Sequence, residues 1–304
     1  MLIQWYPGHM HKASKELRAC LPKVDLVIEI IDARIPFSSQ NPMLAAIRGD
    51  KPCIKLLNKA DLADPVVTQI WQDYLEQQQN TKTLAVSNTQ PEKLRFVTEL
   101  CHKMLPNKQD KQIQVLIMGI PNVGKSTTIN ILANRIVAKT GNEPAVTKMQ
   151  QRIDIGNNII LLDTPGLLWH NIENKNSGYR LAATGAIKDT AIGHEDIASF
   201  AAEYLLAQYP QLIKTRFQLQ ELPENEESLF AIIGKQRGCL RAGGRVDMDK
   251  VAKIVLAELR SGQLGRISLE LPQMMEQELV DLVITREEKA KAKEAKKAQR
   301  LSKK

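Results

Sequence analysis

The 304-residue sequence has no apolar run that approaches the roughly 20 residues needed for a membrane-spanning helix. Its opening residues, MLIQWYPGHMHK, break their apolar stretch at Gln4, Pro7 and Gly8, too early for a secretory signal. These two absences argue against an integral membrane protein and against a secreted one. We therefore expect a cytoplasmic protein that makes no membrane contact.

Cysteine and aromatic residues are also scarce. The four cysteines, Cys20, Cys53, Cys101 and Cys239, stand far apart, without CxxC or Cys/His ligand spacing. This spacing argues against a zinc site or a disulfide framework, so we expect buried, reduced thiols. Aromatic residues make up only 4% of the chain, and none interleaves with its basic stretches, which disfavours nucleic-acid binding by base stacking.

Apolar runs bounded by turn residues recur in the first half of the chain and predict strands. They cover residues 24–32, 52–58, 82–87, 113–119, 151–156 and 158–163. The first four are nearly continuous, as in parallel strands covered on both faces, and the last two predict a hairpin. Helical stretches at 64–77 and 91–105 alternate with the strands, so the predicted class is α/β with a mostly parallel, doubly wound sheet.

Two helix signals are specific enough to be checked residue by residue. Asp64 is suited to cap the helix of residues 64–77, and Pro65 suits its first turn. Its expected apolar stripe is Val67, Ile70, Trp71, Tyr74 and Leu75. After residue 180 the stretches 194–210, 225–238 and 247–262 have helical patterns, the last ending at Gly262, and they predict a smaller, all-helical domain.

The stretch GIPNVGKS, residues 119–126, matches the phosphate-binding loop GxxxxGK[ST] and lies between a predicted strand and a predicted helix. Gly119 and Gly124 would let backbone N–H groups wrap the phosphates, while Lys125 would neutralise the outer ones. The Ser126 hydroxyl would hold Mg²⁺. The predicted phosphate-binding residues are Pro121, Asn122, Val123, Gly124, Lys125, Ser126 and Thr127.

A second motif, DTPG at residues 163–166, follows the last predicted strand. Asp163 is placed to hold Mg²⁺, through water, and the Gly166 N–H to lie near the terminal phosphate. Thr147, in the polar segment between the two motifs, is the residue that we expect to reach Mg²⁺ when the terminal phosphate is present. These motifs together predict a nucleoside triphosphate site.

The stretch NKAD, residues 58–61, has the chemistry to read guanine. The Asp61 carboxylate accepts hydrogen bonds from the N1–H and the 2-amino group of guanine, and adenine offers neither, so discrimination of about 10⁴ or more is within reach. Asn58 would brace the loop and the base, and the Lys59 stem would cover the base. The stretch SNT, which comprises Ser87, Asn88 and Thr89, would present a backbone N–H to the guanine O6.

The guanine-reading motif precedes the phosphate loop, an order that resembles the circularly permuted GTPases. Three further segments, QWYPGHMHKA (4–13), DARIPFSSQNP (32–42) and GQLGRISLELP (262–272), resemble the bacterial ribosome biogenesis GTPase A family. This resemblance implies that GTP hydrolysis drives a late step of large (50S) subunit assembly. The protein would bind the precursor particle and its rRNA in the GTP state and leave after hydrolysis.

The sequence patterns, taken with this resemblance, predict a division of the chain into three parts. Residues 1–180 would form a circularly permuted P-loop GTPase domain, residues 181–285 a helical domain that binds RNA or the ribosome, and residues 286–304 a basic, helix-prone tail. We expect a monomer off the ribosome, and stimulation of hydrolysis by the large subunit.

Leucine occupies position 167, where many GTPases carry the glutamine that orients the attacking water. The family that the chain resembles is hydrophobic-substituted and shares this gap. The resemblance points to His9 as the catalytic residue, because an imidazole can orient or deprotonate water; His11 is the competing histidine. Asn122 resembles the asparagine that binds K⁺ in potassium-stimulated relatives, with a harmless loop residue as the alternative.

The net charge of +8 is concentrated in the tail, where nine basic residues and three glutamates give 9 − 3 = +6. The tail is helix-prone but has no apolar stripe, so alone it should fray, and on rRNA it could order while neutralising phosphates. A purely solubilising tail is the alternative. The helical domain offers further candidates for RNA contact: Lys235, Arg237, Arg241 and Arg245.

Two other functions compete with a ribosome-stimulated GTPase. One is an RNA-binding assembly factor for which the nucleotide is only a structural ligand, an alternative that Leu167 keeps open. The other, an ATP-dependent small-molecule kinase, is disfavoured by NKAD.

Overall fold

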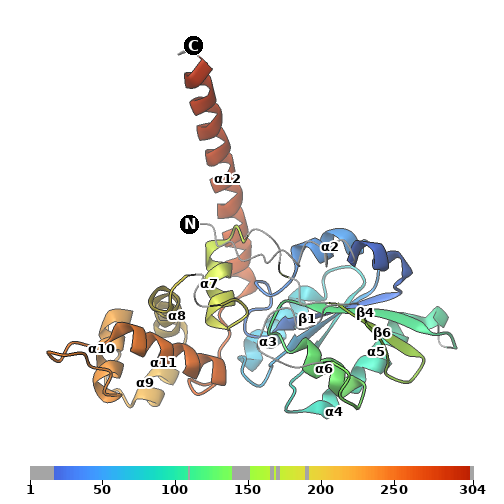
Figure 1. The fold of residues 1–304 in the computed structure, drawn as a ribbon, viewed down its shortest axis with the longest axis horizontal. Coiled ribbons are helices and arrows are strands. Elements are labelled where there is room, and N and C mark those ends of the chain that lie inside the picture. Colours follow the sequence, from blue (N-terminus) through green and yellow to red (C-terminus); the bar gives the residue numbers. More distant parts are fainter. Residues whose placement is uncertain are drawn as a thin grey trace.

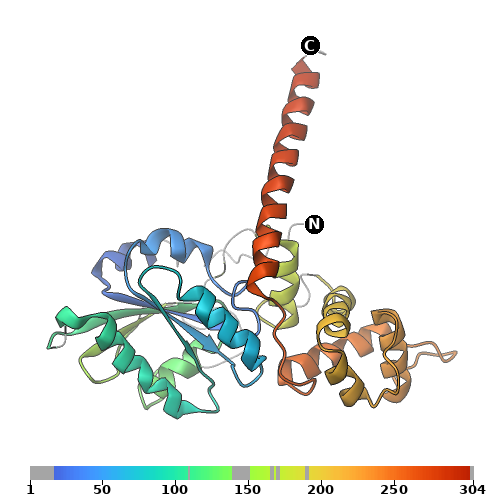
Figure 2. The same ribbon diagram turned by 180° about the vertical axis from the view of Figure 1, so that it is seen from behind.

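The structure is a computed structural model that describes residues 17–108, 110–138, 151–164, 168, 172–188 and 192–301. These residues form a lobe built on a β-sheet, a lobe of helices, and one long helix that projects away from both (Figure 1). The same arrangement is seen from behind in Figure 2. None of the described helices combines the length and the apolar character needed to cross a membrane.

The sheet has six strands in the order β3-β2-β1-β4-β6-β5. Its strands are β1 (Leu26–Asp32), β2 (Cys53–Asn58), β3 (Thr81–Ala85), β4 (Ile113–Gly119), β5 (Gln151–Asp154) and β6 (Ile159–Asp163). Neighbouring strands are parallel except for β5, which pairs with β6 as the antiparallel edge. The predicted fold class and the predicted hairpin are both confirmed.

Helices cover both faces of this sheet, which explains why β1 and β2 are buried at every position and are mostly apolar. They are α2 (Pro42–Arg48), α3 (Pro65–Leu75), α4 (Pro91–Leu94), α5 (Phe96–Met104) and α6 (Lys125–Leu132), with the 3₁₀ turns η1 (Leu21–Lys23) and η2 (Pro106–Lys108). Buried side chains of α4, α5 and α6 pack on one face, and those of α2 and α3 on the other. All four cysteines are buried, as expected.

Local sequence accounts for most of α3. The Asp64 side chain accepts from the N–H groups of Val66 and Val67, and Pro65 opens the helix. Trp71 is fully buried, but Ile70 of the predicted stripe is 39% exposed. The predicted helix over 91–105 is divided, because α4 ends at Leu94 and α5 begins at Phe96.

The helical lobe contains α8 (His194–Gln208), α9 (Pro210–Phe217), α10 (Glu226–Gln236) and α11 (Met248–Ser261). Asn225 and Asp247 cap α10 and α11 through their side chains, and Gly262 ends α11 in the left-handed conformation, with φ of 77°. Three of these helices were predicted, whereas α9 was missed. Its Pro210 breaks the α8 pattern and also begins the next helix.

After α11 the chain returns to the first lobe instead of staying with the helices. The Leu269 N–H donates to the Arg34 carbonyl at 2.8 Å, and the Trp71 indole N–H donates to the Glu270 carbonyl at 3.0 Å. Helix α12 (Pro272–Leu301) then leaves this contact and runs outward (Figure 1). Met275, near its start, is buried in one hydrophobic cluster with Trp71. Residues 286–301 continue α12 as helix, although the tail was expected to fray as an isolated segment.

The predicted domain limits stay predictions. Helix α7 (Lys175–Ala183) runs across the first limit, and α12 runs across the second.

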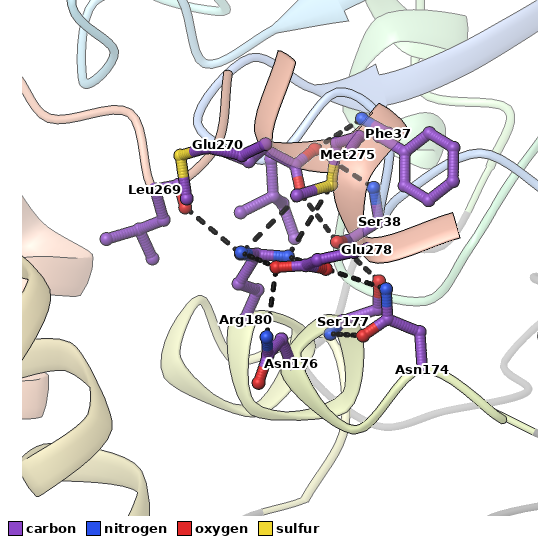
Figure 3. A network of polar contacts seen from close by, with 12 residues as sticks. Phe37, Ser38, Asn174, Asn176, Ser177, Arg180, Leu269, Glu270, Met275 and Glu278 are labelled. Carbon is purple, nitrogen blue, oxygen red and sulfur yellow. Dashed lines mark hydrogen bonds and ion pairs between the residues drawn. The ribbon is translucent and has the colours of Figure 1, made fainter. Parts of the chain in front are cut away.

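A buried polar network joins α7, α12 and the loop after β1 (Figure 3). The Arg180 guanidinium donates to both carboxylate oxygens of Glu278, at 2.7 and 3.0 Å, and to the Leu269 carbonyl at 3.0 Å. The Glu270 carboxylate lies 3.8 Å from Arg180 and accepts from the Ser38 N–H at 3.0 Å and the Ser38 hydroxyl at 2.6 Å. Three segments far apart in the sequence are therefore fixed to one another.

Candidate nucleotide-binding site

The predicted site residues lie where parallel strands end. Asp32 and Asn58, the last residues of β1 and β2, are neighbours in the register, and Gly119 and Asp163 end β4 and β6. The carboxyl edge of an open α/β sheet is where such folds bind ligands. The motifs, far apart along the chain, thus meet at one edge.

The phosphate loop has the geometry that its sequence predicts. Gly124 adopts φ of 93°, a left-handed value that favours glycine, and directly precedes α6. The first backbone N–H groups of α6, which begins at Lys125, have no carbonyl partner within the helix, so this end could hold phosphate oxygens. Ser126 and Thr127 lie in its first turn and are partly exposed.

Lys125 and Asp163 form a buried ion pair that links this loop to the end of β6. Asp163 is 1% exposed, and its second carboxylate oxygen, Oδ2, has no hydrogen-bond partner among the described residues. Burial raises the pKa of Asp163, although Lys125 opposes that shift. A buried carboxylate with an unpaired oxygen suits a divalent cation, so Asp163 and the Ser126 hydroxyl fit Mg²⁺ by their chemistry.

The loop predicted to read guanine, residues 58–61, is hydrogen-bonded directly to the predicted phosphate loop. The Asn58 side chain donates from Nδ2 to the Val123 carbonyl at 2.6 Å. A Cβ atom at position 124 would clash with the Asn58 amide nitrogen and come within 3.1 Å of Asn88 Nδ2. Gly124 is therefore needed for a second reason, the close approach of the two loops.

The Asp61 carboxylate is exposed at this edge and is oriented by its neighbours. The Ser87 hydroxyl donates to Asp61 Oδ1 at 2.7 Å, and Ser87 Oγ accepts from the Thr89 N–H at 3.1 Å. The Asn88 Oδ1 and Asn58 Oδ1 atoms are buried without a partner in the described part of the chain. NKAD and SNT thus form one cluster whose carboxylate remains open to a ligand.

Two residues of this edge, Asp32 and Arg34, were not among the predicted site residues. Arg34 donates to the Asp32 carboxylate at 2.7 and 2.9 Å. The predicted residue Lys59, in the left-handed region with φ of 60°, also pairs through Nζ with Asp32 Oδ2 at 3.0 Å. Burial alone would raise the pKa of Asp32, but the charges of Arg34 and Lys59 outweigh it and hold the pKa well below its ordinary value. The sequence did contain a signal for Asp32. Asp32 ends the predicted strand 24–32 just as Asn58 ends the predicted strand 52–58, and the structure pairs the two residues.

Some predicted site residues cannot be placed. His9, His11, Thr147, Gly166 and Leu167 lie outside the described residues, so their roles stay predictions. For Asn122, the amide nitrogen donates to the Gly185 carbonyl at 2.9 Å, so a cation at Asn122 would be bound by its amide oxygen. Pro121 and Val123 are buried within the loop.

Comparison with known proteins identifies the family of the chain. A family model described as "50S ribosome-binding GTPase" matches residues 114–223. The protein named ribosome biogenesis GTPase A of Priestia megaterium is 45% identical over 289 residues, which is 92% of this chain and 100% of that protein. Its namesake from Bacillus licheniformis is 45% identical over 284 residues, covering 90% of this chain and 100% of the relative.

Solved structures agree with these relatives. The GNP-bound YlqF from T. maritima is 27% identical, with a TM-score of 0.61 over 86% of this chain and 98% of that one. A GDP-bound YlqF structure is 26% identical, with a TM-score of 0.62 over 85% and 99%. The resemblance found in the sequence is thereby confirmed, and the chain belongs to the ribosome biogenesis GTPase A family.

Proposed function

We propose that this protein hydrolyses GTP to drive a late step of large (50S) ribosomal subunit assembly, as a monomer in the cytoplasm. It binds the precursor particle and its rRNA in the GTP state and leaves after hydrolysis. The observation that carries the nucleotide part is the bond between the two loops, from Asn58 Nδ2 to the Val123 carbonyl at 2.6 Å. The ribosomal part is supported by the names of the relatives.

The Lys125–Asp163 ion pair suggests how the site receives its ligand. Both groups are already buried and face each other, so neither has to be desolvated when the nucleotide enters. In our proposal Lys125 binds the outer phosphate oxygens in place of the carboxylate, and Asp163, through water, and the Ser126 hydroxyl would hold Mg²⁺. Mg²⁺ at that point would offset the negative charge that develops on the phosphates during transfer.

Base selection follows from the exposed carboxylate of Asp61, which Ser87 orients. In our proposal Asp61 accepts from the N1–H and the 2-amino group of guanine, while Asn58 braces the loop. A backbone N–H near Asn88, in the SNT stretch, donates to the guanine O6, while the Thr89 N–H is bonded to Ser87. An adenine base would leave the carboxylate without donors, which explains a preference for GTP.

Water activation is assigned to His9 and charge compensation to K⁺ at Asn122. Both assignments rest on the resemblance to hydrophobic-substituted, potassium-stimulated GTPases. We also propose that Thr147 reaches Mg²⁺ and that the Gly166 N–H lies near the terminal phosphate. Measurements of turnover test the roles of His9 and K⁺ most directly.

The surface that we propose for rRNA lies on the helical lobe and the tail. Lys235, Arg237, Arg241 and Arg245 are all exposed. Arg237 and Arg241 also make ion pairs within the lobe, with Glu258 at 2.9 Å and Asp247 at 3.0 Å. Exposed positive charge favours contacts with the phosphate backbone of rRNA. The affinity of the protein for rRNA should therefore fall as the salt concentration rises.

The experiment is GTP turnover by the purified protein with and without large-subunit precursor particles, in K⁺ and in Na⁺. We expect stimulation by the particles, a further gain in K⁺, and loss of stimulated turnover in His9→Ala with GTP affinity nearly unchanged. Turnover that no particle and no cation stimulates would instead favour an assembly factor that uses the nucleotide only as a structural ligand.

A further inference from the structure

The guanine-reading loop is held from behind by the segment that follows α11. The Arg266 side chain donates from Nη2 to the Ala60 carbonyl and from Nε to the Ala63 carbonyl, both at 3.0 Å. Between these bonds the Ile267 N–H donates to the Leu62 carbonyl at 2.9 Å. Three backbone carbonyls next to Asp61, one before it and two after it, therefore accept hydrogen bonds from Arg266 and Ile267. Arg266 lies 206 positions after Ala60 in the sequence.

The contact is close as well as polar. Gly262 adopts φ of 77°, and a Cβ atom there would come within 2.8 Å of the Leu62 side chain. Farther along, the Ser268 hydroxyl accepts from the Asp64 N–H at 3.2 Å. The segment 262–268 therefore lies against the full length of the turn that carries Asp61.

This support matters because the loop is not self-sufficient. Lys59 holds a left-handed φ of 60°, a conformation that costs a non-glycine residue energy and persists only where surrounding contacts impose it. The Asp61 side chain itself receives one bond, from Ser87, and is otherwise exposed. Arg266 also lines, with Asp61 and Ser87, a cavity of about 380 Å³. Arg266 thus holds the backbone on both sides of Asp61 and borders the same cavity as its carboxylate.

We propose that Arg266 is a positioning residue for guanine recognition. Its planar fork spans the two carbonyls that flank Asp61 and fixes the loop so that the carboxylate faces both donors of the base. Lysine, with a single ammonium, cannot span both carbonyls in this way. The inference rests on the proposed guanine specificity, and it assigns part of that specificity to the C-terminal half of the chain.

The test compares GDP with IDP, whose base lacks the 2-amino group. In the unaltered protein GDP should bind on the order of 10-fold more tightly than IDP, because Asp61 gains one charge-assisted hydrogen bond. In Arg266→Ala the carboxylate is misplaced, so GDP affinity should fall about 10-fold and IDP affinity less, and the GDP/IDP ratio should shrink toward one. The GDP/IDP affinity ratio of Arg266→Lys should lie between those of the unaltered protein and Arg266→Ala, because lysine can keep one of the two hydrogen bonds.

Arg152→Ala serves as the matched control, since Arg152 is exposed on β5 at the edge of the sheet away from NKAD. Its GDP/IDP ratio should equal that of the unaltered protein. Titration calorimetry gives the affinities, and a thermal melt identifies any variant that fails to fold. If Arg266→Ala does not fold, Arg266→Lys decides the question alone.

Equal losses of GDP and IDP affinity, or no loss, would overturn the inference, because a merely structural role would not distinguish the two bases. This failure differs from failure of the proposed function. If the unaltered protein did not prefer GDP to ADP, the guanine site itself would be wrong, whatever the Arg266 variants did.

Discussion

Removing the Arg180 side chain would leave a buried carboxylate without its compensating charge. Arg180 is 1% exposed and Glu270 is 0% exposed, with 3.8 Å between the guanidinium and the carboxylate. Glu278 would lose two hydrogen bonds in the same step. Breaking a buried pair by removing one partner typically costs about 3–5 kcal/mol, so we expect Arg180→Ala to lower the free energy of unfolding by that amount.

The loss of unfolding free energy caused by Arg180→Ala should grow as the pH rises. Burial raises the pKa of Glu270 above its ordinary value of 4.5, even though Arg180 opposes the shift. A carboxyl group with a raised pKa binds more protons in the folded state than in the unfolded state, so its contribution to stability falls as the pH rises above 4.5. Without Arg180 the pKa should rise further and extend this window upward. Arg180→Ala should thus be more destabilised at about pH 8 than at about pH 5.

Urea unfolding at both pH values measures the effect. The double variant Arg180→Ala/Glu270→Gln should recover about 1–2 kcal/mol, because the buried charge is gone. Arg286→Ala is the control, since the Arg286–Glu173 pair is exposed and is expected to contribute only about 0–1 kcal/mol. A loss below about 1 kcal/mol for Arg180→Ala, independent of pH, would refute this account of the network.

Three further variants test the nucleotide site. Asp61→Asn should lower GDP affinity about 100-fold and improve binding of xanthosine diphosphate, whose 2-oxo group accepts from an amide; unchanged base preference in competition assays would contradict the assignment. Asp163→Asn should weaken the Mg²⁺ dependence of GDP binding, which a magnesium titration measures. Gly124→Ala should reduce GDP affinity at least about 10-fold through backbone strain and its clash with Asn58; affinity equal to that of the unaltered protein would show that the loops are not held this closely.

Local patterns predicted most of the sheet lobe. The strands β1 and β2 are buried on both faces, so nearly continuous apolar runs marked them, and Asp64 followed by Pro65 marked the start of α3. The phosphate loop and NKAD were recognisable because each motif needs only adjacent residues. Their convergence followed from a general property of parallel sheets, whose strand ends meet at one edge.

The missed features depend on residues far apart in the sequence. Arg180 meets Glu278 across 98 positions, and Arg266 meets Ala60 across 206, so periodicity within one segment contains no trace of either contact. The return of residues 262–270 to the first lobe was missed for the same reason. Ile70 was placed on the buried stripe by spacing alone, yet the neighbouring surface leaves it exposed.

The position of Arg266 has a consequence for protein synthesis. A ribosome translating this chain makes NKAD first, then the phosphate loop, and reaches Arg266 only 206 residues after Ala60. By our inference, a nascent chain that has already exposed every predicted nucleotide-binding motif still selects guanine poorly. Tight GDP binding would then arise only once residue 266 has left the exit tunnel, which makes nucleotide selectivity a late event in the maturation of the polypeptide.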